Sequence, residues 1–373
     1  MLAHDFALVA GLRRKLCRSA ASILPDLPSA MRHPFVLACT AVLLAACAST
    51  PKAPPVAAPA ATTTPAVSVP PPKVGLALGG GAAKGFAHIG VIKMLEANGI
   101  QPAVVAGTSA GSVVGALYAG GMDAYALQQK AVALDEASIR DVSLFSGGLV
   151  KGQKLQDYVN AQLDGRSFAR LKKPFAAVAT RLEDGQRTVF VRGNVGQAVR
   201  ASSAIPGVFE AVAIDKFHYV DGGVVSPVPV DAARELGADL VIAVDISTKP
   251  TGSADAGSLL GNVNRSIAIM GQKLGAAELA RADVVIRPAV NDIGPADFAA
   301  RNRAILEGER AAQAALPQIR AKIAALQAQR LAQARAEADA RATQQREAER
   351  KARCAQQSGW LDKWRRDPDC RVN

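Results

Sequence analysis

The 373-residue sequence is poor in aromatic, cysteine and histidine side chains, and each shortage excludes a class of protein. Aromatic residues make up 4% of the chain and no nucleic-acid-binding motif accompanies the net charge of +12, so we expect no nucleic-acid partner. The five cysteines lack CxxC spacing, which argues against a zinc ribbon or a disulfide scaffold. The four histidines are too scattered for a metal cluster. No apolar run reaches the roughly 18 residues of a membrane-spanning helix.

The positive charge is concentrated at the two ends of the chain. The net charge is +3 over residues 1–46 and +7 over residues 301–373, which leaves +2 for residues 47–300. The central body is therefore nearly neutral. The basic C-terminal segment is typical of a solvated helix face, and contact with anionic lipid is the alternative.

Residues 1–46 have the features of a bacterial signal peptide. Basic residues precede an uncharged run over 35–46, which suits the apolar region of such a signal and is too short to span a bilayer. The run ends Leu-Ala-Ala-Cys, which resembles a lipobox and implies that Cys47 is lipidated and begins the mature protein. Alanine follows Cys47, which in that class of signals favours the outer membrane, facing the periplasm. A plain secretory signal with an unrelated cysteine is the alternative.

The start of the chain and the segment after the signal carry two further predictions. Met31 stands nearer to the apolar run than Met1 does, so residues 1–30 are a candidate for a mis-assigned extension. Residues 47–72 contain the lipid-anchor cysteine and a stretch rich in Pro, Ala and Thr. Its prolines prevent a continuous helix or a paired strand, so we expect a semi-extended spacer.

Residues 73–300 alternate between short apolar runs and helical patterns, which favours a mostly parallel sheet covered by helices. The predicted strands are Val74–Leu78, Pro102–Ala106, Phe175–Thr180, Arg187–Val191, Leu240–Val244 and Val284–Ile286. One predicted helix begins at Gly85 and ends at Asn98-Gly99, and a second runs from the segment Gly107–Gly111 to about Ala119. Two later helices are predicted at Asp231–Leu236 and around Leu259–Leu279.

Residues 301–373 are rich in Ala, Arg and Gln and are predicted to form a basic helical extension. We expect Pro317 to interrupt the helix. Helical packing on the body is favoured over a coiled coil or a helix that binds a protein or cell-wall partner, because no heptad is sustained. Cys354 and Cys370 are candidates for a disulfide in an oxidising compartment.

The segment from Gly79 to Gly85 reads GGGAAKG and lies between a predicted strand and a predicted helix. Small residues permit a sharp turn and leave backbone N–H groups unshielded at a helix N-terminus, where an anion is stabilised. The segment lacks the Gly-Lys-Ser/Thr end of a P-loop and the third glycine of a dinucleotide fingerprint. Taken alone it is a weak signal.

The segment GTSAG, from Gly107 to Gly111, is the second motif. It fits the G-x-S-x-G pattern of a nucleophile elbow, and its position between a strand and a helix is the context that this turn requires. The elbow would push the Ser109 hydroxyl out of the sheet. The third motif is Asp221-Gly222-Gly223, which by itself is most often a turn.

In this order, GGGxxKG, GTSAG and DGG resemble the motifs of the patatin-like phospholipase family, in its bacterial branch. The resemblance covers about residues 73–290, and the segments after Ala201 and Asp221 are similar as well. It implies a three-layer α/β fold whose mostly parallel central sheet carries helices on both faces. It also implies a Ser-Asp dyad in which Ser109 is the nucleophile and Asp221 the base.

The resemblance further implies roles for the glycine-rich segments. Gly80, Gly81 and Ala82 fall on the oxyanion-hole loop, and Lys84 takes its basic position. Ala82 stands where many members have the third glycine, and its N–H survives this change. The supporting motif residues are Gly107, Gly111 and Gly222. No metal or organic cofactor is implied.

A Ser-His-Asp triad is the rival arrangement. Only His88 and His218 lie in the body. His88 falls on the first helix, where packing is the simpler role. His218 lies three residues before Asp221, and in a continuous strand this odd spacing points the two side chains to opposite faces. The dyad is therefore preferred.

These observations predict a serine acyl-ester hydrolase that acts on phospholipid, lysophospholipid or related lipid esters beside a membrane. Acyl transfer to an acceptor other than water would use the same residues. The alternative from another class is a non-catalytic envelope lipoprotein that binds a partner through its C-terminal helix.

Overall fold

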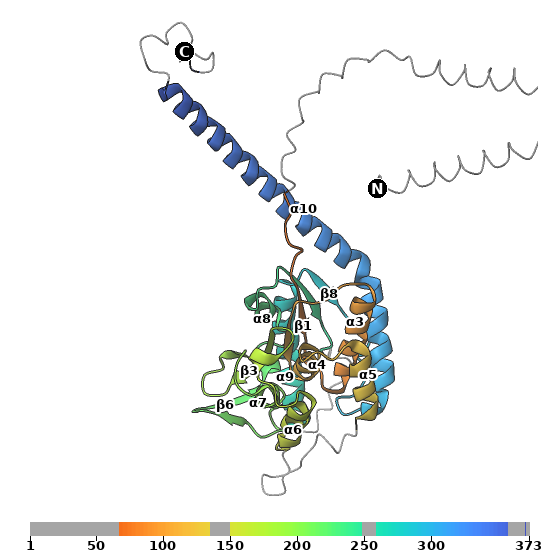
Figure 1. Ribbon diagram of the computed structural model, residues 1–373. Helices are drawn as coiled ribbons and strands as arrows, with labels where there is room; N and C mark the ends of the chain where they lie inside the picture. Colours follow the sequence, from red (N-terminus) through yellow and green to blue (C-terminus); the bar gives the residue numbers. More distant parts are fainter. Residues whose placement is uncertain (1–66, 135–149, 248–258, 357–369, 371–373) are drawn as a thin grey trace, which may run out of the picture. The chain divides into compact units, whose positions relative to one another are not determined.

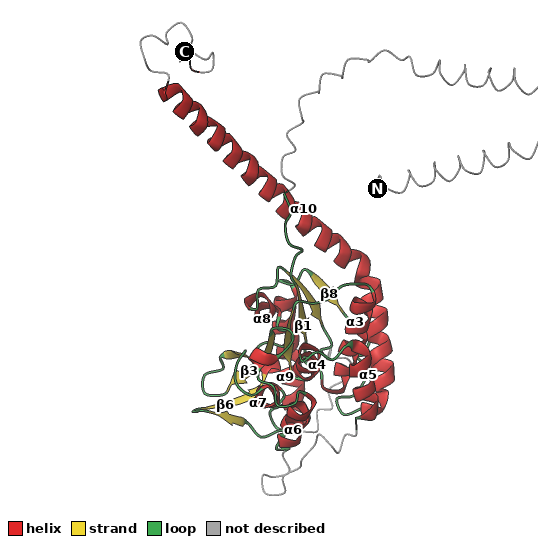
Figure 2. Cartoon of the chain, in the orientation of Figure 1, coloured by secondary structure: helices red, strands yellow, loops and turns green. Residues whose placement is uncertain are grey.

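The computed structural model describes residues 67–134, 150–247, 259–356 and 370 (Figure 1). In these residues eight strands form one sheet (Figure 2). The strand order is β5-β6-β3-β2-β1-β7-β8, and β4 pairs with β3. The strands are β1 (Val74–Leu78), β2 (Val104–Thr108), β3 (Phe175–Arg181), β4 (Arg187–Phe190), β5 (Val212–Ile214), β6 (Phe217–Asp221), β7 (Leu240–Val244) and β8 (Val284–Ile286).

The centre of this sheet is parallel and one edge is antiparallel. The strands β3, β2, β1, β7 and β8 pair in parallel, whereas β4, β5 and β6 add antiparallel pairs. The central strands are buried on both faces and consist of apolar and small residues, as expected when helices cover both sides. The carboxyl ends of β1, β2 and β7 therefore lie at one edge of the sheet.

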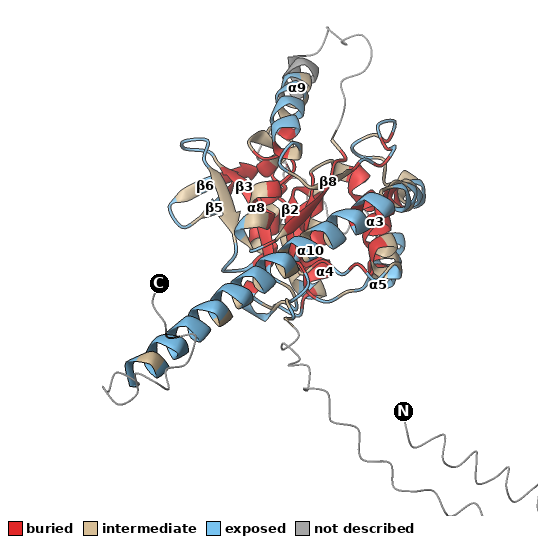
Figure 3. Cartoon of the chain, turned by 90° about the horizontal axis from the view of Figure 1, so that it is seen from above, coloured by how far each residue is buried: buried red, intermediate tan, exposed pale blue. Residues whose placement is uncertain are grey.

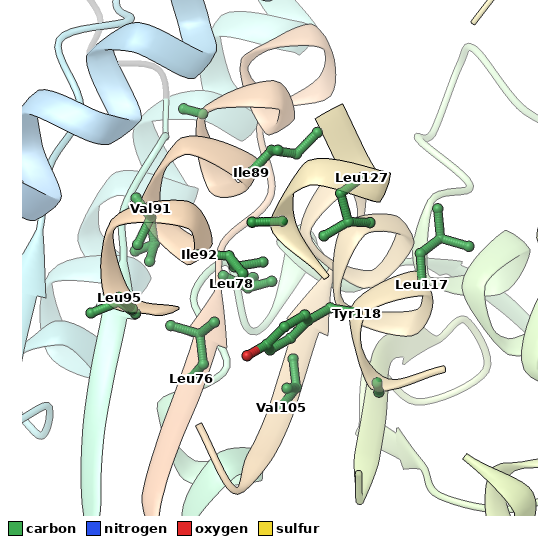
Figure 4. Packing of buried hydrophobic residues seen from close by; sticks show 14 of the residues in the cluster. Leu76, Leu78, Ile89, Val91, Ile92, Leu95, Val105, Leu117, Tyr118 and Leu127 are labelled. Carbon is green, nitrogen blue, oxygen red and sulfur yellow. The ribbon is translucent and has the colours of Figure 1, made fainter. Parts of the chain in front are cut away.

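Helices cover both faces of the sheet. They are η2 (Ala82–Gly85), α3 (Phe86–Ala97), α4 (Ala110–Ala119), α5 (Ala124–Ala133), α6 (Gln153–Gln162), η4 (Phe168–Arg170), α7 (Val195–Ser202), η5 (Gly222–Val224), α8 (Val230–Glu235), α9 (Leu259–Leu279), η6 (Phe298–Ala300) and α10 (Arg301–Gln356). Side chains alternate along each strand, so Leu76 and Leu78 pack toward α3 and α4, whereas Ala77 packs toward α8. Figure 4 shows Leu76 and Leu78 against Ile92 and Tyr118 on the first of these faces.

The predicted three-layer fold with a C-terminal helical extension is confirmed. The strands predicted at Val74–Leu78, Leu240–Val244 and Val284–Ile286 and the helix at Leu259–Leu279 have the predicted bounds. The strand predicted at Pro102–Ala106 begins two residues later, because its ladder to β1 starts at Val104. The strand β5 was not predicted from the sequence; it is a three-residue edge strand that pairs with β6.

The first half of α10 is part of the core. Its buried residues are Ala304, Ile305, Gly308, Ala312, Leu316 and Ile319. It crosses α3 so closely that a Cβ atom on Gly308 would lie 2.0 Å from the Ala87 carbonyl oxygen. A Cβ atom on Gly90 would lie 1.9 Å from the Ile305 carbonyl oxygen. The boundary predicted after residue 300 therefore falls inside one compact unit, which begins at Val67.

The expected interruption at Pro317 is wrong, because α10 continues through it. Pro317 is exposed, and the buried neighbours Leu316 and Ile319 hold the helix on the body. A proline inside a helix costs about 3 kcal/mol, which packing on this scale offsets. The outer half of α10 is largely exposed (Figure 3). Cys354 and Cys370 form a disulfide with their Cα atoms 5.4 Å apart.

None of the helices in the described ranges is long and apolar enough to cross a bilayer. The signal predicted over residues 1–46, Cys47, and the part of the 47–72 spacer up to residue 66 lie outside those ranges.

Candidate active site

Ser109 occupies a sharp turn between β2 and α4. Its backbone has φ 52° and ψ −125°, a conformation that a side chain disfavours. The turn is packed against its neighbours at both glycines of the motif. A Cβ atom on Gly107 would lie 2.3 Å from the Gly111 carbonyl oxygen, and one on Gly111 would lie 2.1 Å from the Leu78 carbonyl oxygen. These contacts explain why the elbow needs glycine on both sides of Ser109.

Hydrogen bonds with one distant serine and one neighbouring serine hold the Ser109 backbone in this turn. Its N–H donates to the Ser202 hydroxyl oxygen at 2.9 Å, and Ser202 in turn donates to the Val178 carbonyl at 2.6 Å. The Ser109 carbonyl accepts from the Ser112 hydroxyl at 2.7 Å. Ser202 is fully buried. The sequence analysis gave Ser202 no role, and only its place in a family-like segment marked it.

Asp221 lies at the carboxyl end of β6, where backbone contacts fix its position. Its N–H donates to the Ala204 carbonyl at 2.8 Å, and its carbonyl accepts from the Thr180 hydroxyl at 2.8 Å. The carboxylate accepts the Gly223 N–H at 2.7 Å, which caps η5. The two glycines after Asp221 thus supply a donor as well as a turn. A Cβ atom on Gly222 would lie 2.1 Å from the Val178 carbonyl oxygen.

The fold brings Ser109 and Asp221 together. The Ser109 hydroxyl lies close enough to the Asp221 carboxylate to favour its ionised form, and both residues are buried. Burial raises the pKa of Asp221 to about 6, and the Ser109 hydroxyl and the hydrogen bond from the Gly223 N–H limit this rise. A carboxylate with this pKa is mostly ionised at neutral pH and is a stronger base than an exposed aspartate.

The glycine-rich loop lies beside Ser109. A Cβ atom on Gly80 would be 3.2 Å from Cβ of Ser109. The N–H of Gly80 donates to the Pro227 carbonyl at 3.0 Å, so Gly80 belongs to the loop but does not have a free donor. Beside Ser109, the N–H groups of Gly81, Ala82 and Ala110 have no hydrogen-bond partner among the described residues.

These N–H groups are the candidate oxyanion donors, and Ala110 is one that the sequence analysis missed. The sequence feature that could have identified Ala110 is its position directly after the nucleophile, at the N-terminus of a helix. Ala82 has φ 52°, the left-handed region in which glycine is favoured. The alanine at this position therefore keeps the N–H donor at the cost of some backbone strain.

His88 and Lys84 are buried and support the glycine-rich loop. The Nε2–H of His88 donates to the Gly79 carbonyl at 2.8 Å, and burial lowers the pKa of His88 to about 4, so its ring is neutral. Burial also lowers the pKa of Lys84, and the charges of Asp292 and Asp245 oppose that shift. His88 thus has the packed role expected for it.

His218 lies away from the pair. Its side chain is 58% exposed, and Nδ1 lies 2.9 Å from a carboxylate oxygen of Glu183. The odd spacing within β6 turns it from Asp221, as the sequence predicts. The described residues therefore contain no histidine that could complete a triad with Ser109.

Glu278 of α9 is a further buried carboxyl group near the site. It accepts the Ser226 hydroxyl at 2.5 Å and the Val228 N–H at 2.8 Å, on the segment that follows Asp221. Burial raises its pKa to about 7.

No group of three or more potential metal ligands occurs in the described part of the chain.

Comparison with known proteins gives the same family. The pattern of the patatin-like phospholipase family matches residues 76–234, which include Ser109 and Asp221. An uncharacterized NTE family protein of Mycobacterium tuberculosis is 37% identical over 185 residues, which are 49% of this chain and 51% of that protein. Lysophospholipase NTE1 of Pyricularia oryzae is 30% identical over 181 residues, 47% of this chain and 12% of that protein.

The chain spans about half the length of the first curated relatives that it matches. Among solved structures, VipD from Legionella pneumophila is similar with a TM-score of 0.48 and 15% identity, over 67% of each chain. The match to the family pattern includes both the elbow serine and the buried aspartate beside it. Residues 76–234 of the chain belong to the patatin-like phospholipase family.

Proposed function

We propose that this protein is a serine hydrolase of lipid acyl esters, with Ser109 as nucleophile and Asp221 as general base. The observation that carries the proposal is the buried Asp221 carboxylate beside the hydroxyl of the elbow serine, Ser109. A serine hydroxyl needs such an adjacent base to become a nucleophile.

In the first half of the reaction, Ser109 Oγ attacks the ester carbonyl carbon while Asp221 takes its proton. The carbonyl oxygen becomes an oxyanion that the N–H groups of Gly81, Ala82 and Ala110 can stabilise. Removing one such donor from a serine hydrolase lowers kcat by about 10²–10³-fold. Collapse of the intermediate breaks the bond to the leaving alcohol, which takes the proton back from Asp221.

In the second half, Asp221 takes a proton from water, and the hydroxide attacks the acyl-Ser109 carbonyl. The same N–H groups stabilise the second oxyanion. When it collapses, Ser109 Oγ leaves with the proton held by Asp221, and the fatty acid is released. No metal or organic cofactor enters these steps.

Phospholipid or lysophospholipid is the proposed substrate class. The family and the relative named a lysophospholipase support it. We also propose that Cys47 anchors the protein by a lipid to the outer membrane, facing the periplasm; the lipobox-like sequence before Cys47 supports this location. Incorporation of labelled palmitate by the wild-type chain, and its loss in Cys47→Ser, would test the anchor.

The test of the activity is hydrolysis of a short-chain p-nitrophenyl ester and of a lysophospholipid by residues 48–373. We expect Ser109→Ala and Asp221→Asn to lose at least about 10³-fold in kcat while remaining folded. Asp215→Asn, an exposed aspartate on the turn before β6, is the matched control and should keep full activity. Full activity of Ser109→Ala would refute the proposal, and inactivity on every ester would favour a partner-binding lipoprotein.

A further inference from the structure

The inner face of α9 packs on the segment that carries Asp221. Gly271, Gly275 and Glu278 recur at helical spacing and form this face. A Cβ atom on Gly271 would lie 3.8 Å from the Gly223 carbonyl oxygen, and one on Gly275 would lie 3.4 Å from the Pro227 ring. Glu278 holds the same segment through its two hydrogen bonds. The position of α9 is therefore tied to that of the proposed base.

The outer face of α9 is apolar and exposed. Met270 is 54% exposed, Ile269 43% and Leu274 40%. Met270 and Leu274 are one turn apart on one side of the helix, and Lys273 lies beside Met270, on the side away from the two glycines. Figure 3 shows α9 standing out from the body with these turns exposed. Adjacent exposed apolar residues on one helix are a feature of interaction surfaces.

The charge on α9 has one sign on its outer side. Its basic residues are Arg265 and Lys273. Its only acidic residue is Glu278, which is buried and turned toward Ser226 and Val228. A helix with apolar and basic residues on its outer side and without exposed acidic groups complements an anionic lipid surface.

We propose that the outer face of α9, formed by Ile269, Met270, Lys273 and Leu274, docks on an anionic lipid surface. The apolar side chains enter the interface and Lys273 contacts lipid phosphates. Because the inner face of the helix holds the segment of Asp221, docking places the Ser109–Asp221 pair beside the lipid. This inference rests on the proposed lipid hydrolysis and adds the surface by which the enzyme meets its substrate.

The test is co-sedimentation of residues 48–373 with vesicles, in a Ser109→Ala background that prevents hydrolysis. The vesicles contain phosphatidylcholine with phosphatidylglycerol, or phosphatidylcholine alone. We expect Met270→Glu/Leu274→Glu to weaken binding to the anionic vesicles at least tenfold, and Lys273→Glu to weaken it several-fold. Leu306→Glu, on α10 and 42% exposed, is the matched control and should bind like the parent. Unchanged binding of the double variant would overturn the proposal.

Activity separates this inference from the proposed function. With Ser109 intact, the double variant should keep its kcat on a soluble p-nitrophenyl ester and lose about tenfold in rate on vesicle phospholipid. If no ester is cleaved by the wild type, the function fails, while vesicle binding still tests the docking face. A dimer that the double variant converts to a monomer, without any effect on vesicle binding, would assign the face to a second copy and overturn lipid docking.

Discussion

The hydroxyl oxygen of Ser202 accepts the backbone N–H of Ser109 at 2.9 Å. Since Ser202 also donates to the Val178 carbonyl, it connects β3, α7 and the elbow through one buried side chain. Ser202 does not face the substrate in the proposed mechanism. It is a positioning residue for the nucleophile.

Ser202→Ala should therefore impair both stability and catalysis. The buried N–H of Ser109 and the carbonyl of Val178 would lose their partner, at about 1–3 kcal/mol for each unsatisfied group. We expect the Tm to fall by several degrees and kcat to fall about ten- to a hundredfold, because small displacements of a nucleophile are costly. Thermal melts and ester hydrolysis would measure both.

The neighbouring serine provides the control for this prediction. The Ser203 hydroxyl is buried and has no hydrogen-bond partner in the described structure. Ser203→Ala should leave kcat unchanged and the Tm equal or slightly higher. Equal losses in the two variants would show that Ser202 has no specific role in positioning Ser109.

The activity should depend on the ionisation of Asp221. The base must be a carboxylate, and the pKa of Asp221 is raised to about 6. We expect kcat/KM to rise about tenfold per pH unit below pH 6 and to level off above it. A profile measured with a p-nitrophenyl ester, whose leaving group needs little protonation, would test this. A plateau that extends down to pH 4 would contradict the assignment.

The same shift predicts a gain in stability when the charge is removed. Unfolded Asp221 ionises near its ordinary pKa of 3.8, whereas native Asp221 ionises near 6, so between these values the unfolded state binds fewer protons. The free energy of unfolding should fall by about 3 kcal/mol as pH rises through this interval. Asp221→Asn should raise the Tm at pH 8 and have little effect at pH 4, as calorimetry would show.

Replacement of Ala82 by glycine should preserve both the fold and the activity. The left-handed conformation costs an alanine about 1–2 kcal/mol, partly offset by the greater freedom of glycine in the unfolded chain. Ala82→Gly should raise the free energy of unfolding by up to about 1 kcal/mol and keep kcat within about threefold, since the N–H donor remains. Urea titration would measure the first quantity. A large loss of activity would mean that the methyl group itself positions the loop.

Gly308 should not tolerate a side chain. A Cβ atom there would lie 2.0 Å from the Ala87 carbonyl oxygen, so Gly308→Ala must push α10 from α3. We expect a loss of at least about 3 kcal/mol in the free energy of unfolding. Gly271→Ala in α9 is the matched control, because its Cβ would have 3.8 Å of room, and alanine there should be neutral or stabilising.

Elements that depend on neighbouring residues could be predicted from the amino-acid pattern. The runs Val74–Leu78 and Leu240–Val244 are apolar over their whole length, and their strands follow from that pattern alone. The elbow at Ser109 could be predicted for the same reason, since two glycines and a strand-to-helix context are local signals. The strand periodicity also directed His218 away from Asp221.

Contacts between groups far apart in the chain could be identified only in the folded protein. The Gly80 N–H donates to the Pro227 carbonyl, and the Ser109 N–H donates to the Ser202 hydroxyl oxygen. The helix α10 crosses α3 at Gly308. Pro317 stays helical because Leu316 and Ile319 are held in the core. Such pairings depend on strand register and helix packing between distant segments. Local propensities do not encode these relationships, whereas the hydrogen bonds and apolar contacts of the folded state select one arrangement.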